Sequence, residues 1–458
     1  MTTLSIQSIQ WIILLLVSIG LVGISPIARN AAGFFAGVSK SNTQPGFFLL
    51  TSSLVISWIF AKSITNAANL GLEFGIVGGL AYAVYYFSFL VAGIVIYQLR
   101  MKGGFQSLYH YLSSQFGRSA ILLFSLLISI RLFNEVWSNT MIIGSYFGEI
   151  GSMPYVMAII TFTGLTLIYS LRGGLRSSLI TDLIQMMLFG ILLLMILSAI
   201  LPQYESVRPI MTSGKWTMAT GLNLLFVAAL QVFSYPFHDP VLTDRAFISG
   251  PRTMLHSFIA ATGIGFSCIL LFSFVGIHGR LIGMEGEAVV QVSQTLGVIA
   301  LLAVNTIMVT SAASTLDSTF SSVSKLAIVD LNPTGNPSIT KGRLAMVITA
   351  VAGSLPLFFS PEIIQATTIS GTMVLGLAPV FLLWKLNAPR ISFHLSVWTG
   401  IIIGLILTFN LLPEQWQFTD GRYADLFTLN VIGALLCFGL YCLPIPLRRW
   451  FPNSAAYM

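Results

Sequence analysis

The chain has 458 residues, of which 55% are hydrophobic and only 8% are charged, and its mean hydropathy is +0.88. Soluble domains carry roughly 25% charged residues, so this composition excludes a soluble enzyme domain and indicates an all-α polytopic membrane protein. The three cysteines lie in apolar runs without metal-ligand spacing, which predicts small core residues.

A membrane-spanning helix requires about 20 mostly apolar residues, and thirteen segments of the sequence satisfy this requirement. No polar stretch between them is long enough for a soluble domain, so residues 1–458 are predicted to form a single transmembrane domain. The first segment has no basic residue before it, which indicates an uncleaved helix and not a signal peptide. The predicted spans are residues 8–27, 47–70, 76–98, 119–146, 153–171, 178–201, 218–237, 254–277, 295–328, 343–360, 363–384, 393–412 and 427–447.

Lys and Arg concentrate in the cytoplasmic loops of membrane proteins, so their positions predict the orientation. With the N-terminus outside, fifteen of the 22 Lys and Arg residues fall in cytoplasmic segments, Arg245 among them, and four fall in outer segments. The other three, Lys62, Arg131 and Lys325, lie within spans. The asymmetry predicts an inner (plasma) membrane protein with its C-terminus in the cytoplasm. It also accounts for the net charge of +7 without a nucleic-acid partner.

The second span changes character halfway along. Residues 47–60 are apolar, whereas residues 61–69 are small and polar and include Lys62 at about mid-membrane depth. Transporters use discontinuous helices at this depth because unwound carbonyls can coordinate a cation. A small-residue packing face is the alternative, but such a face does not need an ammonium group.

Charged residues inside spans are costly and mark pathways or sites. Arg131 and Glu135 in the fourth span are four residues apart, so they share a helix face and are predicted to form an intramembrane ion pair. Asn134 and Asn139 extend a polar stripe beside them, which leaves a role in a pathway open. Asp182 lies near the start of the sixth span.

The seventh span ends among aromatic residues and two prolines, Pro236 and Pro240, which are predicted to interrupt the helix. Phe233 and Tyr235 would then form the wall of a small-solute site, or alternatively part of an interfacial aromatic belt. No metal-binding His/Glu motif, phosphate loop or nucleophile elbow occurs in a fitting context, so no enzymatic activity is expected.

The ninth span carries a stripe of hydroxyl groups. Ser311, Ser314, Thr315 and Ser318 recur at spacings of three and four, with the carboxylate of Asp317 alongside. Hard oxygen ligands with one carboxylate suit a small cation such as sodium. The hydroxyl groups alone could equally serve as hydrogen bonds between helices.

Four motifs in these positions resemble the sodium:solute symporter family, which includes proline, galactose, sialic acid and urea transporters. The most specific is the segment 173–185, similar to the family's Gly-Gly-x-x-x-x-x-x-Thr-Asp-x-x-Gln signature; the others are residues 105–117, 240–245 and 314–318. The resemblance implies a leucine-transporter-like core of two inverted repeats, at approximately residues 47–201 and 218–384. The stretch from Trp58 to Gly75 is partly similar to the urea and polyamine branch.

The resemblance also implies ion sites. The family's main sodium site carries over to the carbonyls of Ala61 and Ile64, the hydroxyls of Ser314 and Thr315, and the backbone of Ser311. A second ion or coupling site, present in some members, carries over to Asp182, Asp317 and Ser318. The coupling ion is the only cofactor expected.

Lys62 departs from the family pattern, in which this position is usually neutral or acidic. Its ammonium could replace a bound sodium, bind an anionic substrate, or pair with Asp317 or Glu135. The expected function is sodium-coupled symport of a small polar solute by alternating access, with no obligate protein partner. The alternatives are a sodium-independent carrier, proton-coupled or uncoupled, and a membrane sensor that works with a separate signalling partner. The residues predicted to bind the substrate are Lys62, Thr65, Asn66, Asn69, Phe233 and Tyr235.

Overall fold

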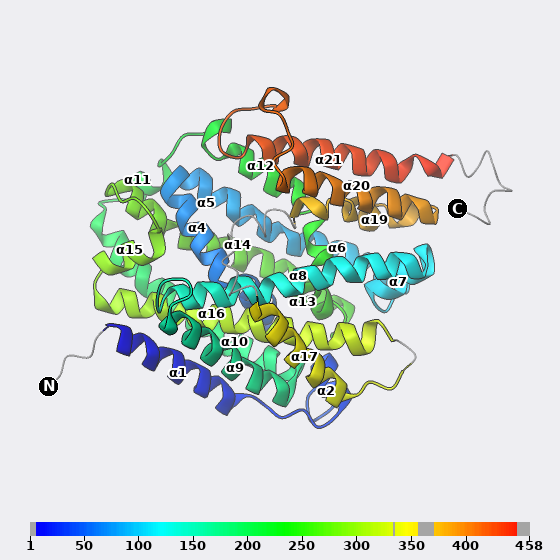
Figure 1. Cartoon of the computed structure of the whole chain (residues 1–458), viewed down its shortest axis with the longest axis horizontal. Helices are drawn as coiled ribbons and strands as arrows, with labels where there is room; N and C mark the ends of the chain where they lie inside the picture. The colour runs from blue at the N-terminus through cyan, green and yellow to red at the C-terminus, as the bar shows by residue number, and fades with distance from the viewer. Residues whose placement is uncertain (1–5, 333–334, 356–370, 447–458) are drawn as a thin grey trace.

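A computed structural model of the protein describes residues 6–332, 335–355 and 371–446, and all regular structure in these ranges is helical (Figure 1). The longer helices are α1 (Ile6–Ile24), α8 (Arg118–Ser145), α9 (Met153–Gly173), α10 (Leu175–Ile200), α14 (Pro251–Leu281), α16 (Val298–Lys325), α17 (Ile339–Ser354), α20 (Arg390–Thr408) and α21 (Ala424–Cys442). The shorter helices are α2 (Ala31–Ala36), α3 (Phe47–Trp58), α4 (Ala61–Phe74), α5 (Ile76–Ala83), α6 (Phe87–Met101), α7 (Leu108–Phe116), α11 (Arg208–Met211), α12 (Leu222–Gln231), α13 (Pro240–Arg245), α15 (Ala288–Thr295) and α19 (Leu377–Leu382). Single turns are η1 (Val84–Tyr86), η2 (Leu201–Gln203), η3 (Met218–Thr220), η4 (Tyr235–His238), η5 (Leu326–Asp330), η7 (Trp384–Leu386) and η8 (Glu414–Trp416).

Ten of the thirteen predicted spans are present as apolar helices long enough to cross a bilayer. In the described residues eight single helices and the continuous run α5–η1–α6 (Ile76–Met101) meet this criterion, and the bent pair α3–α4 makes the tenth. The prediction for residues 218–237 differs, because α12 has only 10 residues before the chain breaks. The predictions for residues 343–360 and 363–384 extend into 356–370, which lie outside the described residues.

Two spans are interrupted where the sequence carries polar residues or proline. The axes of α3 and α4 differ by 60° across Ile59 and Phe60, which are not helical. The second interruption separates α12 from η4 and α13, with Pro236 and Pro240 in the first turns of the latter two elements. Proline is tolerated there because the first-turn N–H has no helical partner. The predicted discontinuity of both spans is therefore confirmed.

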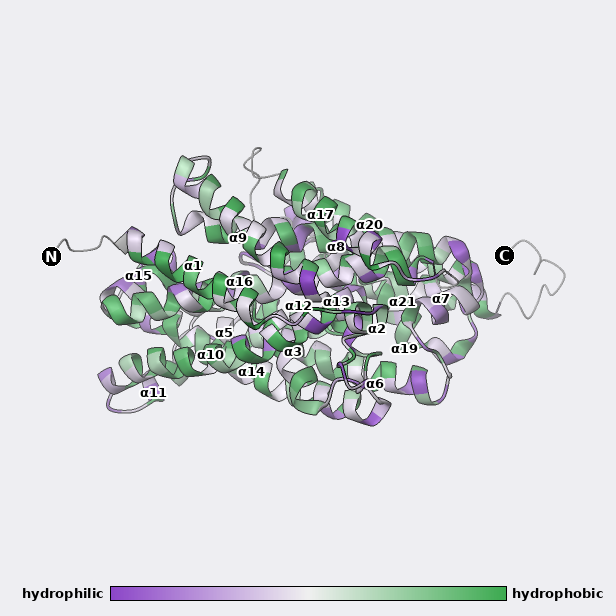
Figure 2. Ribbon diagram, turned by 90° about the horizontal axis from the view of Figure 1, so that it is seen from below, coloured by the Kyte–Doolittle hydropathy of each residue, from purple (hydrophilic) through white to green (hydrophobic). Residues whose placement is uncertain are grey.

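The helix α16 lies at the centre of the bundle. In its most apolar window 78% of the residues are buried inside the protein, against 17% for α1 at the periphery. Hydrophobic residues cover the outer helices (Figure 2), and many of them are exposed, such as Leu16, Ile191 and Leu194. A surface of this kind is stable against lipid and not against water.

Glycines let α4 approach α14 closely. A Cβ atom at Gly276 of α14 would lie 1.7 Å from the carbonyl oxygen of Ala68, and one at Gly71 would lie 2.4 Å from that of Ser273. Small residues allow such backbone contacts between membrane helices. Because this face of α4 is pressed against α14, its polar residues are left on another face.

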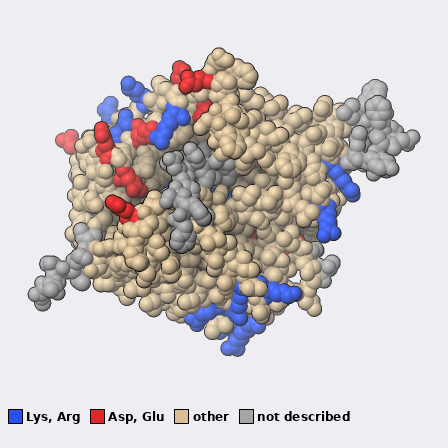
Figure 3. Space-filling model, in the orientation of Figure 1, with Lys and Arg blue, Asp and Glu red and all other residues tan. Residues whose placement is uncertain are grey.

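Charged side chains divide between the ends of the bundle. On the face in Figure 3, acidic residues gather at the upper left, near α11, α15 and the loop before α21, together with a few basic ones. Lys and Arg occur without acidic neighbours at the right and along the bottom of this view. The two ends of the molecule therefore present different electrostatic surfaces.

Candidate functional site

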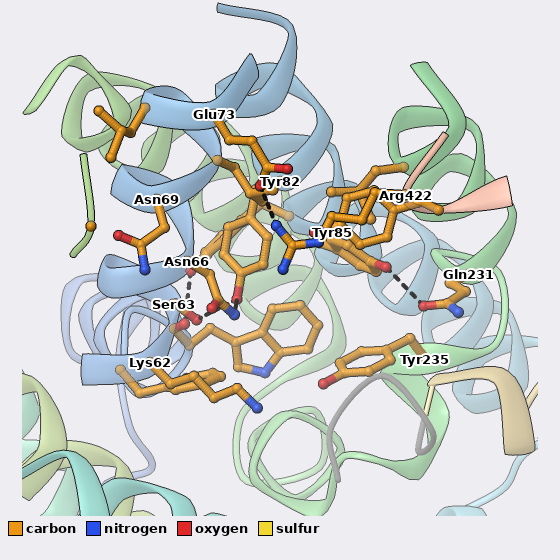
Figure 4. Close-up of a pocket in the computed structure, with 18 of the residues that line it drawn as sticks. Lys62, Ser63, Asn66, Asn69, Glu73, Tyr82, Tyr85, Gln231, Tyr235 and Arg422 are labelled. Atoms are coloured by element: carbon orange, nitrogen blue, oxygen red, sulfur yellow. Dashed lines mark hydrogen bonds and ion pairs between the residues drawn. The ribbon is translucent and has the colours of Figure 1, made fainter. Parts of the chain in front are cut away.

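A cavity of about 560 Å³ lies beside α4 (Figure 4). Its floor and walls come from α4, the α5–η1 segment, α8, α12 and η4, and its rim comes from the loops before α15 and α21. It is lined by Trp58, Phe60, Lys62, Ser63, Asn66, Asn69, Leu70, Leu72, Glu73, Tyr82, Tyr85, Tyr86, Arg131, Leu224, Gln231, Tyr235, Met284, Glu285, Gly286, Arg422 and Tyr423. The volume and mixed lining suit a small polar molecule.

One stripe of α4 supplies the polar wall of this cavity. Lys62, Asn66, Asn69 and Glu73 follow one another at spacings of four, three and four, which places them on one helix face. Lys62 lies deepest and Glu73 lies at the rim (Figure 4). A solute entering from the rim therefore meets amide groups before it reaches the ammonium.

Aromatic residues form the opposite wall. The Tyr235 ring packs edge-on against Trp58, with centroids 5.6 Å apart, and lies 6.0 Å from the ring of Tyr85. Hydrogen bonds fix the phenols: Tyr85 donates to Oε1 of Gln231 at 2.9 Å, and Tyr86 donates to the Trp58 carbonyl at 2.7 Å. The result is a wall of packed aromatic rings, two of which are held in place by hydrogen bonds.

An ion pair spans the rim of the cavity. Arg422 of the α20–α21 loop donates to Oε2 of Glu73 at 2.5 Å, and both side chains are partly exposed. Its exposure limits its contribution to stability to about 0–1 kcal/mol. The pair can therefore open at little cost to the fold.

A charged cluster lies beside the deep end of the cavity. Arg131 pairs with Glu135 at 2.6 Å and with Asp239 at 3.2 Å, and its guanidinium stacks on Tyr235 at 5.2 Å. Lys62 is 4% exposed, and its Nζ makes no hydrogen bond to any described residue. The structure therefore brings Lys62 near this cluster without pairing it to Glu135 or Asp317.

The Asp182 carboxylate lies in a second buried network between α3, α10, α13 and α16. It accepts hydrogen bonds from Ser53, from Ser314 at 2.5 Å, and from Nη2 of Arg245 at 3.1 Å. The same Nη2 donates to Ser318 at 2.8 Å. Arg245, counted among the cytoplasmic residues from the sequence, lies at the end of α13, and its side chain is fully buried.

Asp317 belongs to the same network but faces other partners. It accepts hydrogen bonds from Thr181 at 2.9 Å and from Ser318 at 3.3 Å. The three residues predicted for a second ion site, Asp182, Asp317 and Ser318, are thus together. The guanidinium of Arg245 already lies among their oxygen atoms.

Backbone carbonyls at the end of α3 face the hydroxyl stripe of α16. Thr315 donates to the Ser57 carbonyl at 3.4 Å and to that of Ser311 at 3.2 Å. Because α3 stops at Trp58, the carbonyls of Ile56 and Ile59 have no helical partner. Neither accepts a backbone or side-chain hydrogen bond from any described residue.

Ala61 and Ile64 occupy a different position from the one their predicted role requires. Both lie within α4, so their carbonyls accept from N–H groups four residues ahead along the helix. The carbonyls left open by the break are those of Ile56 and Ile59, five residues earlier. This shift arises because the break precedes the polar run and does not coincide with it.

No protein-family model matches the chain. The human sodium/myo-inositol cotransporter is 28% identical over 201 residues, which are 39% of this chain and 27% of that protein. Mouse solute carrier family 5 member 4A is 24% identical over 237 residues, which are 47% of this chain and 36% of that protein. The matched region thus spans only about a quarter to a third of these relatives.

The structural similarity extends over nearly the whole chain. A Na⁺-coupled sialic acid symporter, solved in a substrate-bound outward-open state, superposes with a TM-score of 0.75 at 15% identity, covering 97% of this chain and 98% of that one. The chain is thus similar to sodium-coupled cotransporters in sequence over part of its length, and to this symporter in fold over nearly all of it. Mhp1, a nucleobase-cation-symport-1 transporter, has a TM-score of 0.58 at 12% identity, covering 95% and 96%.

These similarities confirm the predicted leucine-transporter-like fold and a multi-pass membrane protein. The similarity to the urea and polyamine branch gains no support from them.

Of the six residues predicted to bind a substrate, four line the cavity: Lys62, Asn66, Asn69 and Tyr235. Thr65 is on another face of α4, and Phe233 is 43% exposed on the outside of η4 and α12. The aromatic residues Tyr82 and Tyr85 were missed because the third span is apolar overall. Arg422 was missed because it comes from a distant loop.

Proposed function

We propose that the protein is a secondary active transporter that couples the movement of a small polar solute to that of sodium by alternating access. The observation that carries this proposal is the adjacency of three features. The α3–α4 break lies beside the hydroxyl groups of α16, and Trp58, the last residue of α3, lines the cavity. Sodium coupling is also what the names of the partial relatives describe.

The sodium site that fits these features lies between the end of α3 and α16. Its oxygen donors are the open carbonyls of Ile56 and Ile59, the hydroxyls of Ser314 and Thr315, and the Ser311 carbonyl. Ser314 donates its only proton to Asp182, so the lone pairs of its oxygen are free for a cation. Oxygen donors of this kind suit a small hard cation.

One sodium ion per cycle is the stoichiometry that the second network favours. The residues predicted for a second ion, Asp182 and Ser318, already bind the fixed positive charge of Arg245. A cation beside that guanidinium would experience repulsion at short range and low dielectric. Asp182 therefore serves to orient Ser314 and does not hold an ion of its own.

The two interruptions support the internal repeat. The breaks at α3–α4 and at α12–η4–α13 occupy the first helices of the proposed repeats 47–201 and 218–384. Paired broken helices are a feature of inverted-repeat transporters. Alternating access would consist of one repeat rocking against the other around the cavity. With the N-terminus outside, as the sequence predicts, the rim of the cavity would face the outside of the cell.

The position of Lys62 weighs against a sodium-independent carrier. Its side chain lines the cavity and points toward Tyr235 (Figure 4). Its ammonium therefore does not replace a cation at the break. A sensor would bind the same ligands without moving them, and a flux measurement separates the two functions.

The test uses purified protein reconstituted into liposomes and a panel of labelled small solutes. We expect at least one solute to accumulate against its gradient when sodium is higher outside, and not when potassium or choline replaces sodium. Accumulation without a sodium gradient would contradict the coupling. Sodium-dependent binding without any accumulation would favour the sensor.

A further inference from the structure

We propose that the transported solute carries a carboxylate group and that the ammonium of Lys62 binds it. This inference rests on the proposed transport function and specifies the substrate class. It starts from the buried Lys62, which faces the cavity and has no hydrogen-bond partner among the described residues.

Burying an ammonium without an acceptor is one of the most unfavourable arrangements in a protein, above all within a membrane. Lys62 is 4% exposed, and its three N–H donors reach no acceptor among the described residues. Its side chain extends along the cavity floor (Figure 4). A ligand that supplies acceptor oxygens there would remove this penalty.

The neighbouring carboxylates bind other donors, and neither forms a hydrogen bond with Lys62. Glu135 accepts from Arg131 through Oε1 and from Asn139 through Oε2. Asp239 accepts from Arg131 through Oδ2, and its Oδ1 caps α13 by accepting from the Leu242 N–H. Because no described residue supplies an acceptor for Lys62, we assign that role to the solute.

The formal charges around Lys62 balance when its ammonium is included. Arg131 with Glu135 and Asp239 has a net charge of −1, which favours a positive charge nearby. Lys62 makes these four residues neutral together. A solute carboxylate would supply the short-range acceptors that the described residues do not offer to Lys62.

A carboxylate matches these donors better than a neutral group does. Hydrogen bonds between an ammonium and a carboxylate are roughly twice as strong as neutral ones. The bound carboxylate would leave the region with one negative charge, which a sodium ion at the α3 break neutralises. Sodium and the solute would therefore each strengthen the binding of the other.

The other residues that line the cavity indicate which further groups the solute carries. Asn66 and Asn69 offer amide groups on the α4 side, and Trp58 and Tyr235 offer ring faces, with the amide of Gln231 lying on the side of Tyr235 (Figure 4). Amides recognise hydroxyl groups, and ring faces pack against the apolar face of a compact body. A hydroxylated carboxylic acid fits both walls.

The experiment identifies which small molecule the protein binds from a mixture of cellular metabolites. Purified protein in sodium buffer is incubated with a deproteinised cell extract and washed, and the retained small molecules are released and identified by mass spectrometry. The affinity of each retained acid is then measured beside its amide, for example glucuronate beside glucuronamide, in sodium and in choline. The same extract is applied to Lys62→Met, Lys62→Arg and Thr65→Val.

We expect the wild type to retain a carboxylate in a sodium-dependent manner. Lys62→Met is expected to bind it about 10- to 100-fold more weakly, because a hydrogen bond to a charged group is lost. Lys62→Arg should restore part of the affinity. Thr65→Val, on the same helix but outside the cavity, should match the wild type, and the melting temperatures of all four proteins show whether each is folded.

Retention of a neutral or cationic solute by the wild type would overturn the inference but leave the proposed transport function intact. Equal binding of the acid and its amide, or unchanged binding by Lys62→Met, would overturn it as well. Sodium stabilisation of the protein without retention of any carboxylate also counts against it. Loss of the sodium effect itself would instead contradict the proposed function.

Discussion

Replacing Thr315 with alanine is expected to weaken sodium binding by about tenfold or more. The Thr315 hydroxyl lies between α16 and the end of α3, where it contacts the Ser57 carbonyl at 3.4 Å. Removing an oxygen that binds a charged ligand costs about 1.5–3 kcal/mol, and each 1.4 kcal/mol is about a factor of ten in affinity. The sodium concentration that gives half-maximal thermal stabilisation of the purified protein measures this affinity.

Thr310→Ala is the matched control for this experiment. Thr310 is on the same helix and is buried, but its hydroxyl donates to carbonyls of its own helix, Thr306 at 2.8 Å and Ile307 at 3.0 Å. It should bind sodium like the wild type. Equal sodium affinity in Thr315→Ala and Thr310→Ala would place the ion elsewhere.

Replacing Asp182 with asparagine is expected to destabilise the fold by about 3–5 kcal/mol, because it leaves the buried Arg245 without its counter-ion. Both side chains are inaccessible to solvent, and they are 3.1 Å apart. Thermal or denaturant unfolding in detergent measures the loss. The double variant Asp182→Asn with Arg245→Gln should recover part of it, since no isolated charge then remains buried.

Glu73→Gln serves as the comparison for this loss. This substitution also breaks a close ion pair, but the side chains of Glu73 and Arg422 are partly exposed at the cavity rim. Its effect should be at most about 1 kcal/mol. If Asp182→Asn lowers the free energy of unfolding by as little as Glu73→Gln does, then another group balances the charge of Arg245.

The sequence predicted the interrupted spans because their causes are local. Proline at 236 and 240 and the change from apolar to polar residues after Phe60 both act over a few positions. The first break lies earlier in the chain than the sequence predicted, because the polar residues from Ala61 onward form a regular helix. Their polarity marks the face of α4 that lines the cavity, and the unwound residues Ile59 and Phe60 are apolar.

The partners of the buried charges could not be predicted in the same way. Arg245 is 63 residues from Asp182 in the sequence, and only the inward turn of α13 brings them together. Arg422 and Glu73 are 349 residues apart. Spacing along one helix predicts which residues share a face, as for Arg131 and Glu135, but it carries no information on which faces of different helices meet.

The most direct test of a sodium site between α3 and α16 is the melting temperature of the purified wild-type protein as sodium replaces choline at constant ionic strength. A ligand that binds only the folded state raises the melting temperature by mass action. The account predicts a saturable rise with sodium that potassium does not reproduce. The same melting temperature in sodium, potassium and choline would contradict it.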